Sequence, residues 1–216
     1  MATFRPPGPG PIAVFPDARL TLDYFQQRDV YSDDPFTGDV EPAEPFALGL
    51  IVRNTGAGQA HDFTITSAQP QIIENEKGLL IDFKLIGTQV GDEEVTPTLT
   101  ANLGDIPPAG ARAARWLFTS SLEGKFIDYI ASFEHVDSLG DVNLSLIDQV
   151  AIHELIHVVR DDRPGADAGP DFLVNDVPDA DDLPDTLYFS SGAHEAVTVL
   201  ASASVDGAAT LSDRVV

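Results

Sequence analysis

The stretch PFALGLIV, residues 45–52, decides the fold class of this chain. From Phe46 onward every second residue is a large apolar one, and this period of two places those side chains on one face of a β-strand. The stretch RLTLDYFQ, residues 19–26, repeats the pattern from Leu20 to Tyr24. Both segments are therefore predicted to be strands with one face in a hydrophobic core.

Further alternating runs follow, separated by turn signals such as NTG at residues 54–56 and PPAG at residues 107–110. Gly110 is expected to supply the positive φ that favours glycine in a turn. Because no long amphipathic helix pattern lies between the runs, they predict an all-β fold, an antiparallel β-sandwich over residues 18–160.

The composition limits the classes of partner. The chain has 216 residues with 35 acidic against 12 basic ones, a formal net charge of −23, and no cysteine. This charge would repel nucleic acid and anionic membrane surfaces, so neither is expected as a partner. No apolar run approaches the ~18 residues of a membrane span, so no membrane insertion is expected. The start lacks the layout of a secretion signal, and we expect a piece of a longer protein.

The rest of the chain divides by composition. Residues 1–17 are rich in Pro and Gly and are expected to be extended. Residues 161–185 are rich in Asp and Pro and are predicted to be an acidic linker, and residues 186–216 to be added strands or part of a second β unit. Oxygen donors of this kind are typical of calcium sites. The candidate Ca²⁺ ligands are Asp176, Asp179, Asp181 and Asp182.

Three stretches carry a family resemblance: FALGLIVRNTGAGQAHDFTIT at residues 46–66, NLGDIPPAGARAARWLFTSS at residues 102–121, and EGKFIDYIASFEHVD at residues 123–137. They resemble the CARDB and DUF11-like immunoglobulin-type modules of large bacterial extracellular and cell-surface proteins. The resemblance implies an immunoglobulin-like sandwich, a location outside the cell or on its surface, and a spacer, adhesion or assembly role without catalysis.

One motif points to an enzyme instead. The stretch QVAIHELIHVVR, residues 149–160, contains HExxH at residues 153–157. On a helix, His153 and His157 could bind zinc and Glu154 could act as general base. The segment is rich in β-branched residues, however, and a catalytic zinc needs a third protein ligand. The extension HxxGxxH is absent, because Arg160 stands where its glycine would be.

Read as a strand, the same segment places both histidines on one face and Glu154 on the other, with the histidines roughly 13 Å apart. That separation would prevent them from sharing one metal ion. We expect a strand here because of the β-branched residues, and we therefore expect no zinc. The predicted function is a non-catalytic structural, adhesion or self-assembly module that binds neighbouring modules or copies of itself. Surface polysaccharide is a further candidate partner. The alternatives are a zinc peptidase and a carbohydrate-binding module, and the latter is disfavoured because Trp116 lies in a core-type strand.

Overall fold

The computed structural model describes residues 17–65, 81–125, 146–177, 183–200 and 202. These residues form strands and connecting turns without any helix, so the prediction of an all-β fold is confirmed. The strands are β1 Leu20–Gln26, β2 Asp29–Val30, β3 Phe46–Asn54, β4 Ala60–Ile65, β5 Phe83–Val90, β6 Glu93–Val95, β7 Ala101–Ile106, β8 Ala111–Ser120, β9 Gly124–Lys125, β10 Ile147–Val159, β11 Asp171–Asn175, β12 Thr186–Tyr188 and β13 His194–Ala196.

Nine of these strands form one sheet in the order β13-β12-β11-β10-β1-β3-β8-β5-β6, while β2 pairs with β9 and β4 pairs with β7. Most neighbours in the large sheet are antiparallel, but β1 and β10 run parallel over the whole length of β1. The sheet is therefore mixed, which corrects the expectation of a purely antiparallel sandwich. Residues 126–145, which include most of the stretch EGKFIDYIASFEHVD, lie outside the described residues.

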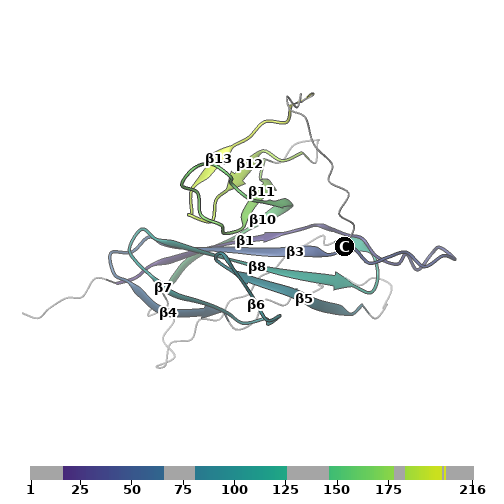
Figure 1. The fold of residues 1–216 in the computed structure, drawn as a ribbon, viewed down its shortest axis with the longest axis horizontal. Coiled ribbons are helices and arrows are strands. Elements are labelled where there is room, and N and C mark those ends of the chain that lie inside the picture. Colours follow the sequence, from purple (N-terminus) through teal and green to yellow (C-terminus); the bar gives the residue numbers. More distant parts are fainter. Residues whose placement is uncertain (1–16, 66–80, 126–145, 178–182, 201, 203–216) are drawn as a thin grey trace, which may run out of the picture.

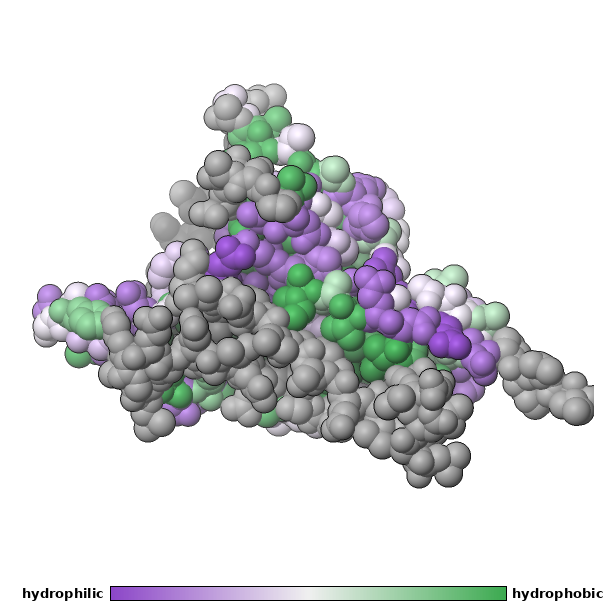
Figure 2. Space-filling view, turned by 180° about the vertical axis from the view of Figure 1, so that it is seen from behind, coloured by the Kyte–Doolittle hydropathy of each residue, from purple (hydrophilic) through white to green (hydrophobic). Residues whose placement is uncertain are grey.

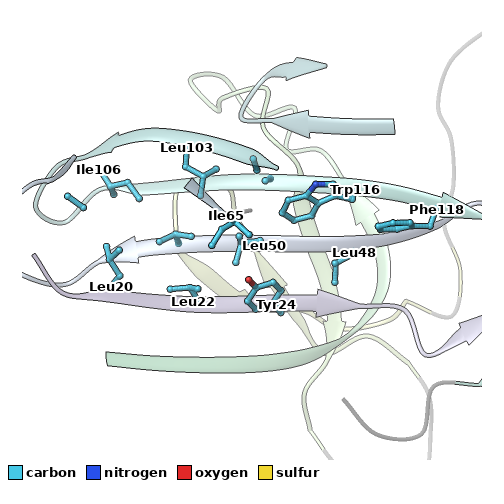
Figure 3. Packing of buried hydrophobic residues seen from close by; sticks show 14 of the residues in the cluster. Leu20, Leu22, Tyr24, Leu48, Leu50, Ile65, Leu103, Ile106, Trp116 and Phe118 are labelled. Carbon is cyan, nitrogen blue, oxygen red and sulfur yellow. The ribbon is translucent and has the colours of Figure 1, made fainter. Parts of the chain in front are cut away.

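One face of the large sheet carries the main core. The alternating side chains from Leu20 to Tyr24 and from Phe46 to Val52 all lie in it, as their period predicted. The small β4–β7 sheet covers this face with residues such as Ile65 and Leu103, and Figure 3 shows them above the strands of the large sheet. The predicted core faces of β1 and β3 are confirmed.

The opposite face of the sheet is covered by its own C-terminal strands. In Figure 1, β11–β13 lie on the side of the sheet away from β4 and β7. The ring of Phe172 on β11 lies directly over Gly49 of β3, where an added Cβ would be 2.2 Å from the ring. A second cluster of buried side chains forms there, and it includes Phe25, Ile51 and Val174. Glycine at position 49 thus allows the sheet to fold back over itself.

The predicted turn at residues 54–56 is organised by Asn54. Its side chain is 1% exposed; its amide donates to the carbonyls of Gly58 and Ile106, and its oxygen accepts from two backbone N–H groups. In the turn at residues 107–110, Ala109 has the positive φ of 59°. The expectation that Gly110 would take this conformation was wrong. Gly110 instead packs against Pro107, at a point where a Cβ would be 2.9 Å from that ring.

The C-terminal third differs from the predicted arrangement. Residues 171–175 lie within the segment predicted as a linker, yet they form β11 and pair with β10. Strands β12 and β13 then extend the same sheet. The described residues after 160 therefore belong to a layer of the large sheet, and the residues beyond 202 lie outside the description.

Polar and apolar residues both appear on the face shown in Figure 2. Figure 2 shows mainly hydrophilic residues around the C-terminal strands on the side facing the viewer, with a small apolar group near the centre. Within the described ranges, no helix has the length and apolar character to cross a membrane.

Candidate functional site

The HExxH motif lies on β10, a strand of thirteen residues. Its first part pairs with β1 and its second part with β11, so the motif sits where both partners meet. A zinc-peptidase helix is therefore absent at these residues, and the predicted strand is confirmed. The strand geometry spreads the motif along the sheet instead of gathering it around one point.

A β-bulge changes the side-chain alternation within the motif. The register between β10 and β11 shifts between Leu155 and His157, and Leu155 and Val158 both pack in the second core. Two residues three apart share a face only when a bulge inserts an extra residue between them. His157, next to Val158, therefore points away from the face that His153 shares with Leu155. The expectation that both histidines lie on one face was wrong. Because the two side chains lie on opposite faces of β10, they cannot bind one metal ion together.

Glu154, the candidate general base, is held by a cation. An oxygen of its carboxylate lies 3.2 Å from a guanidinium nitrogen of Arg28, which follows β1. His157 is exposed to solvent, on the same strand but beyond the bulge. Neither residue faces His153. The three residues of the motif that suggested an enzyme therefore lie in three different environments.

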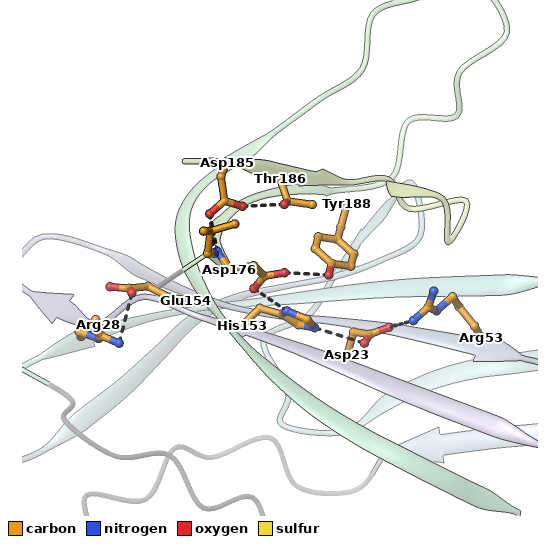
Figure 4. Close-up of polar contacts among 10 residues, drawn as sticks. Asp23, Arg28, Arg53, His153, Glu154, Asp176, Asp185, Thr186 and Tyr188 are labelled. Carbon is orange, nitrogen blue, oxygen red and sulfur yellow. Dashed lines mark hydrogen bonds and ion pairs between the residues drawn. The ribbon is translucent and has the colours of Figure 1, made fainter. Parts of the chain in front are cut away.

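His153 lies between two carboxylates from distant parts of the chain. Its Nδ1 is 2.8 Å from Oδ1 of Asp176, which follows β11, and its Nε2 is 3.2 Å from Oδ1 of Asp23 on β1. Figure 4 shows the ring between these two acids. The His153 side chain is 11% exposed. Since an ionised carboxylate only accepts hydrogen bonds, both ring nitrogens must carry a proton for both bonds to form. The geometry therefore requires an imidazolium cation.

Each carboxylate has a second partner that occupies its other oxygen. Oδ2 of Asp23 accepts from the guanidinium of Arg53 at 2.6 Å. Oδ2 of Asp176 accepts from the hydroxyl of Tyr188, on β12, at 2.8 Å. All four carboxylate oxygens thus have donors. We call these five residues the His153 network, which carries two positive and two negative charges when His153 is protonated.

Aromatic rings enclose the same histidine. The ring of Phe25 stacks on His153 with centroids 5.1 Å apart, and Phe172 stacks on the far side of Phe25 at 4.3 Å. Tyr188 lies 4.7 Å from His153 and itself stacks with His194 of β13. These contacts restrict solvent around the charged ring, which strengthens its ion pairs.

The pKa of His153 reflects a competition between burial and charge. Burial is the largest single effect and lowers the pKa, because it disfavours the cation. The hydrogen bonds and charges of Asp176 and Asp23 together outweigh it and raise the pKa of His153 to about 9. For Asp176, burial acts to raise the pKa, but the bonds from His153 and Tyr188 prevail and lower it. Burial and the bond to Asp176 raise the pKa of Tyr188. His153 is therefore protonated at neutral pH.

The acidic segment supplies acceptors for backbone N–H groups. Asp171, only 2% exposed, accepts from the backbone nitrogens of Asp161 and Ser190. Asp185 accepts from the backbone nitrogens of Asp176 and Val177. These bonds fix the turns that connect β10 to β13, and they account for part of the Asp content of this region.

The predicted calcium ligands are only partly described. Asp176 gives both oxygens to His153 and Tyr188, so we assign it to the His153 network and not to a cation site. Asp179, Asp181 and Asp182 lie outside the described residues. No group of three metal-ligating side chains occurs in the part of the chain that is described. Calcium binding by the remaining three acids stays a prediction.

Sequence reasoning did not find Asp23, Arg53 or Tyr188 as members of this network. One signal was available for Asp23, a charged residue within the apolar strand LTLDYFQ, since a buried carboxylate requires a partner. Its partner His153 stands 130 positions away, and no local pattern links the two.

No family model, curated protein or solved structure matches this chain. The resemblance to CARDB and DUF11-like modules therefore stays a prediction.

Proposed function

We propose that this chain is a non-catalytic structural module of an extracellular or cell-surface protein, acting as a spacer, adhesion or self-assembly unit. One observation carries the proposal. The HExxH motif lies on a strand, where His153 is committed to two carboxylates and His157 points to the opposite face. The most enzyme-like stretch of the sequence is thus used to hold the fold together.

The chemistry of zinc supports this proposal. A catalytic zinc ion needs three protein ligands around one point and an open position for water. His153 could bind a metal only by giving up an ion pair, and Glu154 would have to leave Arg28 to act as a base. Both changes would break contacts that join β10 to its neighbours. Zinc chemistry would therefore need the same side-chain atoms that stabilise the fold.

Among the described residues, no exposed aromatic ring lies on a strand face, where carbohydrate-binding modules present an aromatic platform. Trp116 is fully buried, and its indole nitrogen donates to the carbonyl of Thr98. Exposed aromatic rings do occur at Tyr31 and Phe36, but these residues lie in the connection between β2 and β3. The arrangement favours packing and assembly over recognition of a sugar ring.

The sheet edges restrict how copies could join. The outermost strands, β6 and β13, have three residues each and carry Glu93, Glu94 and Glu195. Short, charged edges resist addition of a further strand. Along β5, Thr88–Val90 pair with β6.

Two measurements test the proposal together. Metal analysis of the purified chain, combined with peptidase assays on the wild type and Glu154→Gln, should show neither stoichiometric zinc nor activity that depends on Glu154. Light scattering and electron microscopy over a concentration series should show chains or multimers. Stoichiometric zinc with Glu154-dependent cleavage would overturn the proposal, whereas a strict monomer would remove only self-assembly from it.

Calcium is tested separately, because the proposed role does not depend on it. A rise in melting temperature at millimolar Ca²⁺, absent with Mg²⁺, would support a site among Asp179, Asp181 and Asp182. Equal melting temperatures with and without Ca²⁺ would exclude a calcium site that stabilises the fold.

A further inference from the structure

We propose that His153 is a pH-operated latch, which holds β11–β13 against the large sheet while it is protonated and releases them when it loses its proton. The proposal goes beyond the structural role above, since it gives the module a second, more open state that pH controls.

The ring of His153 lies between the body of the sheet and the strands that fold over it. His153 belongs to β10, Asp23 to β1, Asp176 to the end of β11, and Tyr188 to β12. The hydrogen bonds of one cation therefore connect the body of the sheet to the layer that folds over it. Figure 4 shows these side chains converging from separate strands. Loss of this single charge acts on the contact between the two parts directly.

The number of protons on the His153 ring decides how many of these hydrogen bonds can form. A neutral imidazole has one N–H, so it can donate to Asp23 or to Asp176 but not to both. The other carboxylate would then face a nitrogen lone pair at hydrogen-bond distance. The network would also change from two charges of each sign to a net charge of −1. Asp23 keeps Arg53 as a partner, so Asp176 and the layer that carries it lose the larger share of the attraction.

Among the described residues, no other side chain donates hydrogen bonds to both Asp23 and Asp176 as His153 does. Besides Asp23 and Asp176, the packed elements contribute Arg53 from β3, Tyr188 from β12, and His194, which stacks on Tyr188. Glu154 faces away and pairs with Arg28, and Asp185 accepts from the Asp176 backbone. Arg53 is bound to Asp23, so it cannot replace the His153 proton at Asp176.

Few apolar side chains would hold β11–β13 in place without the hydrogen bonds of His153. Among the described residues, the second core contains seven buried side chains, whereas the main core contains seventeen. Of those seven, only Phe172 and Val174 belong to β11–β13. A layer fastened by so few apolar side chains depends more strongly on its polar contacts than the main core does. Its release would uncover Phe25, Ile51 and the second half of β10.

The absence of cysteine provides a clean test. Val174→Cys places a thiol in the second core, and Val52→Cys places one in the main core; both valines are fully buried. The rate of thiol labelling, divided by the rate in denaturant at the same pH, reports how often each site opens. This normalisation removes the ordinary rise in thiol reactivity with pH.

With the latch, normalised labelling of Val174→Cys should rise on the order of fifty-fold between pH 7 and pH 10, because opening becomes easier as the proton is lost. Labelling of Val52→Cys should change much less. Adding Asp176→Asn or His153→Gln to Val174→Cys should raise labelling at pH 7 and flatten its pH dependence.

Equal pH profiles at the two sites, or a Val174→Cys profile that is flat from pH 7 to pH 10, would overturn the latch. Should His153→Gln fail to fold, the wild-type background with its two thiol positions decides the matter alone. The test measures opening and not catalysis or assembly, so its failure would leave the structural proposal standing.

Discussion

The two faces of the large sheet are held by different forces. The main core under β4 and β7 is made of apolar side chains such as Leu50, Trp116 and Phe118, all with almost no exposed surface. The opposite face combines a smaller apolar cluster with the charged His153 network. Apolar burial scales with area and does not depend on protonation, whereas ion pairs depend on pH and on the geometry of every partner.

One fold can therefore contain two kinds of layer. We call the main core under β4 and β7 the permanent layer, because its stability does not depend on protonation, and we call β11–β13 the conditional layer. The permanent layer sets the overall stability, since it buries most of the large side chains. The conditional layer, β11–β13, is joined to the sheet by the pairing of β11 with β10, by the second core and by the titratable His153 network. Substitutions in the two layers should therefore differ in size, in extent and in their dependence on pH.

The largest effect is expected in the main core. Leu50→Ala removes a fully buried side chain, and such truncations cost about 2–5 kcal/mol of unfolding free energy. The loss should affect the whole fold, and the single Trp116 provides the fluorescence signal for chemical denaturation. Leu200→Ala, at a residue 78% exposed, is the control and should change stability by less than about 0.5 kcal/mol. Equal losses from both variants would contradict the assignment of the main core.

His153→Gln should cost about 3 kcal/mol at pH 7, because it leaves two carboxylates without their shared cation. Denaturation of this variant and of His157→Gln provides a matched pair within one motif. His157 is exposed and outside the network, so its substitution should change stability by about 0.5 kcal/mol or less. A larger loss from His157→Gln than from His153→Gln would show that the wrong histidine has been assigned.

The pH dependence of stability should have a definite sign. The folded-state pKa of His153, about 9, lies above the ordinary value of 6.5. Its contribution is therefore fully present below pH 6.5 and disappears as the pH rises through 9, a loss of about 2–3 kcal/mol. Unfolding free energies of the wild type measured from pH 6 to pH 10 should fall accordingly, whereas those of His153→Gln should lack this component. Parallel curves of unfolding free energy against pH for the two proteins would refute this contribution of His153.

Gly49→Ala tests the contact between the layers without touching any charge. The new methyl group would meet the Phe172 ring at 2.2 Å, so the ring or the layer must move, at a cost of about 1–3 kcal/mol. Gly87→Ala is the matched control on β5, where the nearest atom is 3.5 Å away. Hydrogen exchange should show faster exchange in β11 and β12 for Gly49→Ala alone. A uniform change across the chain, or none, would argue against the close approach.

The smallest effect is expected at Glu154. Glu154→Gln removes one partly exposed ion pair with Arg28, which contributes less than about 1 kcal/mol. Thermal unfolding should detect at most a shift of a few degrees. A large loss of stability would mean that Glu154 has a structural role beyond that pair.

The features that sequence could predict are those with a local cause. The period of two in residues 45–52 and 19–26 predicted both strands and their buried faces, and the β-branched run around the motif predicted β10. The apolar patch Phe172-Leu173-Val174 was visible within the acidic segment, although its neighbours led to the prediction of a linker. A short strand there gains its stability from pairing with β10, which no local pattern reveals.

The features that sequence could not predict depend on contacts between distant residues. The parallel pairing of β1 with β10 depends on how the chain returns to the sheet. The bulge that separates His153 from His157 depends on the register with β11. Strict alternation is only a first approximation wherever a strand passes from one partner to another. The His153 network depends on both, because it combines residues from β1, β3, β10, β12 and the turn after β11.

The protonation state of the His153 ring tests the central claim most directly. Nitrogen NMR of the chain with ¹⁵N-labelled histidine reports both ring nitrogens across a pH titration, with His153→Gln to assign the signal. At pH 7.5 both nitrogens of His153 should be protonated, and the midpoint should lie near pH 9. A neutral ring at pH 7.5, or a midpoint at or below the ordinary value of 6.5, would contradict the account of His153 as the cation that fastens the two layers.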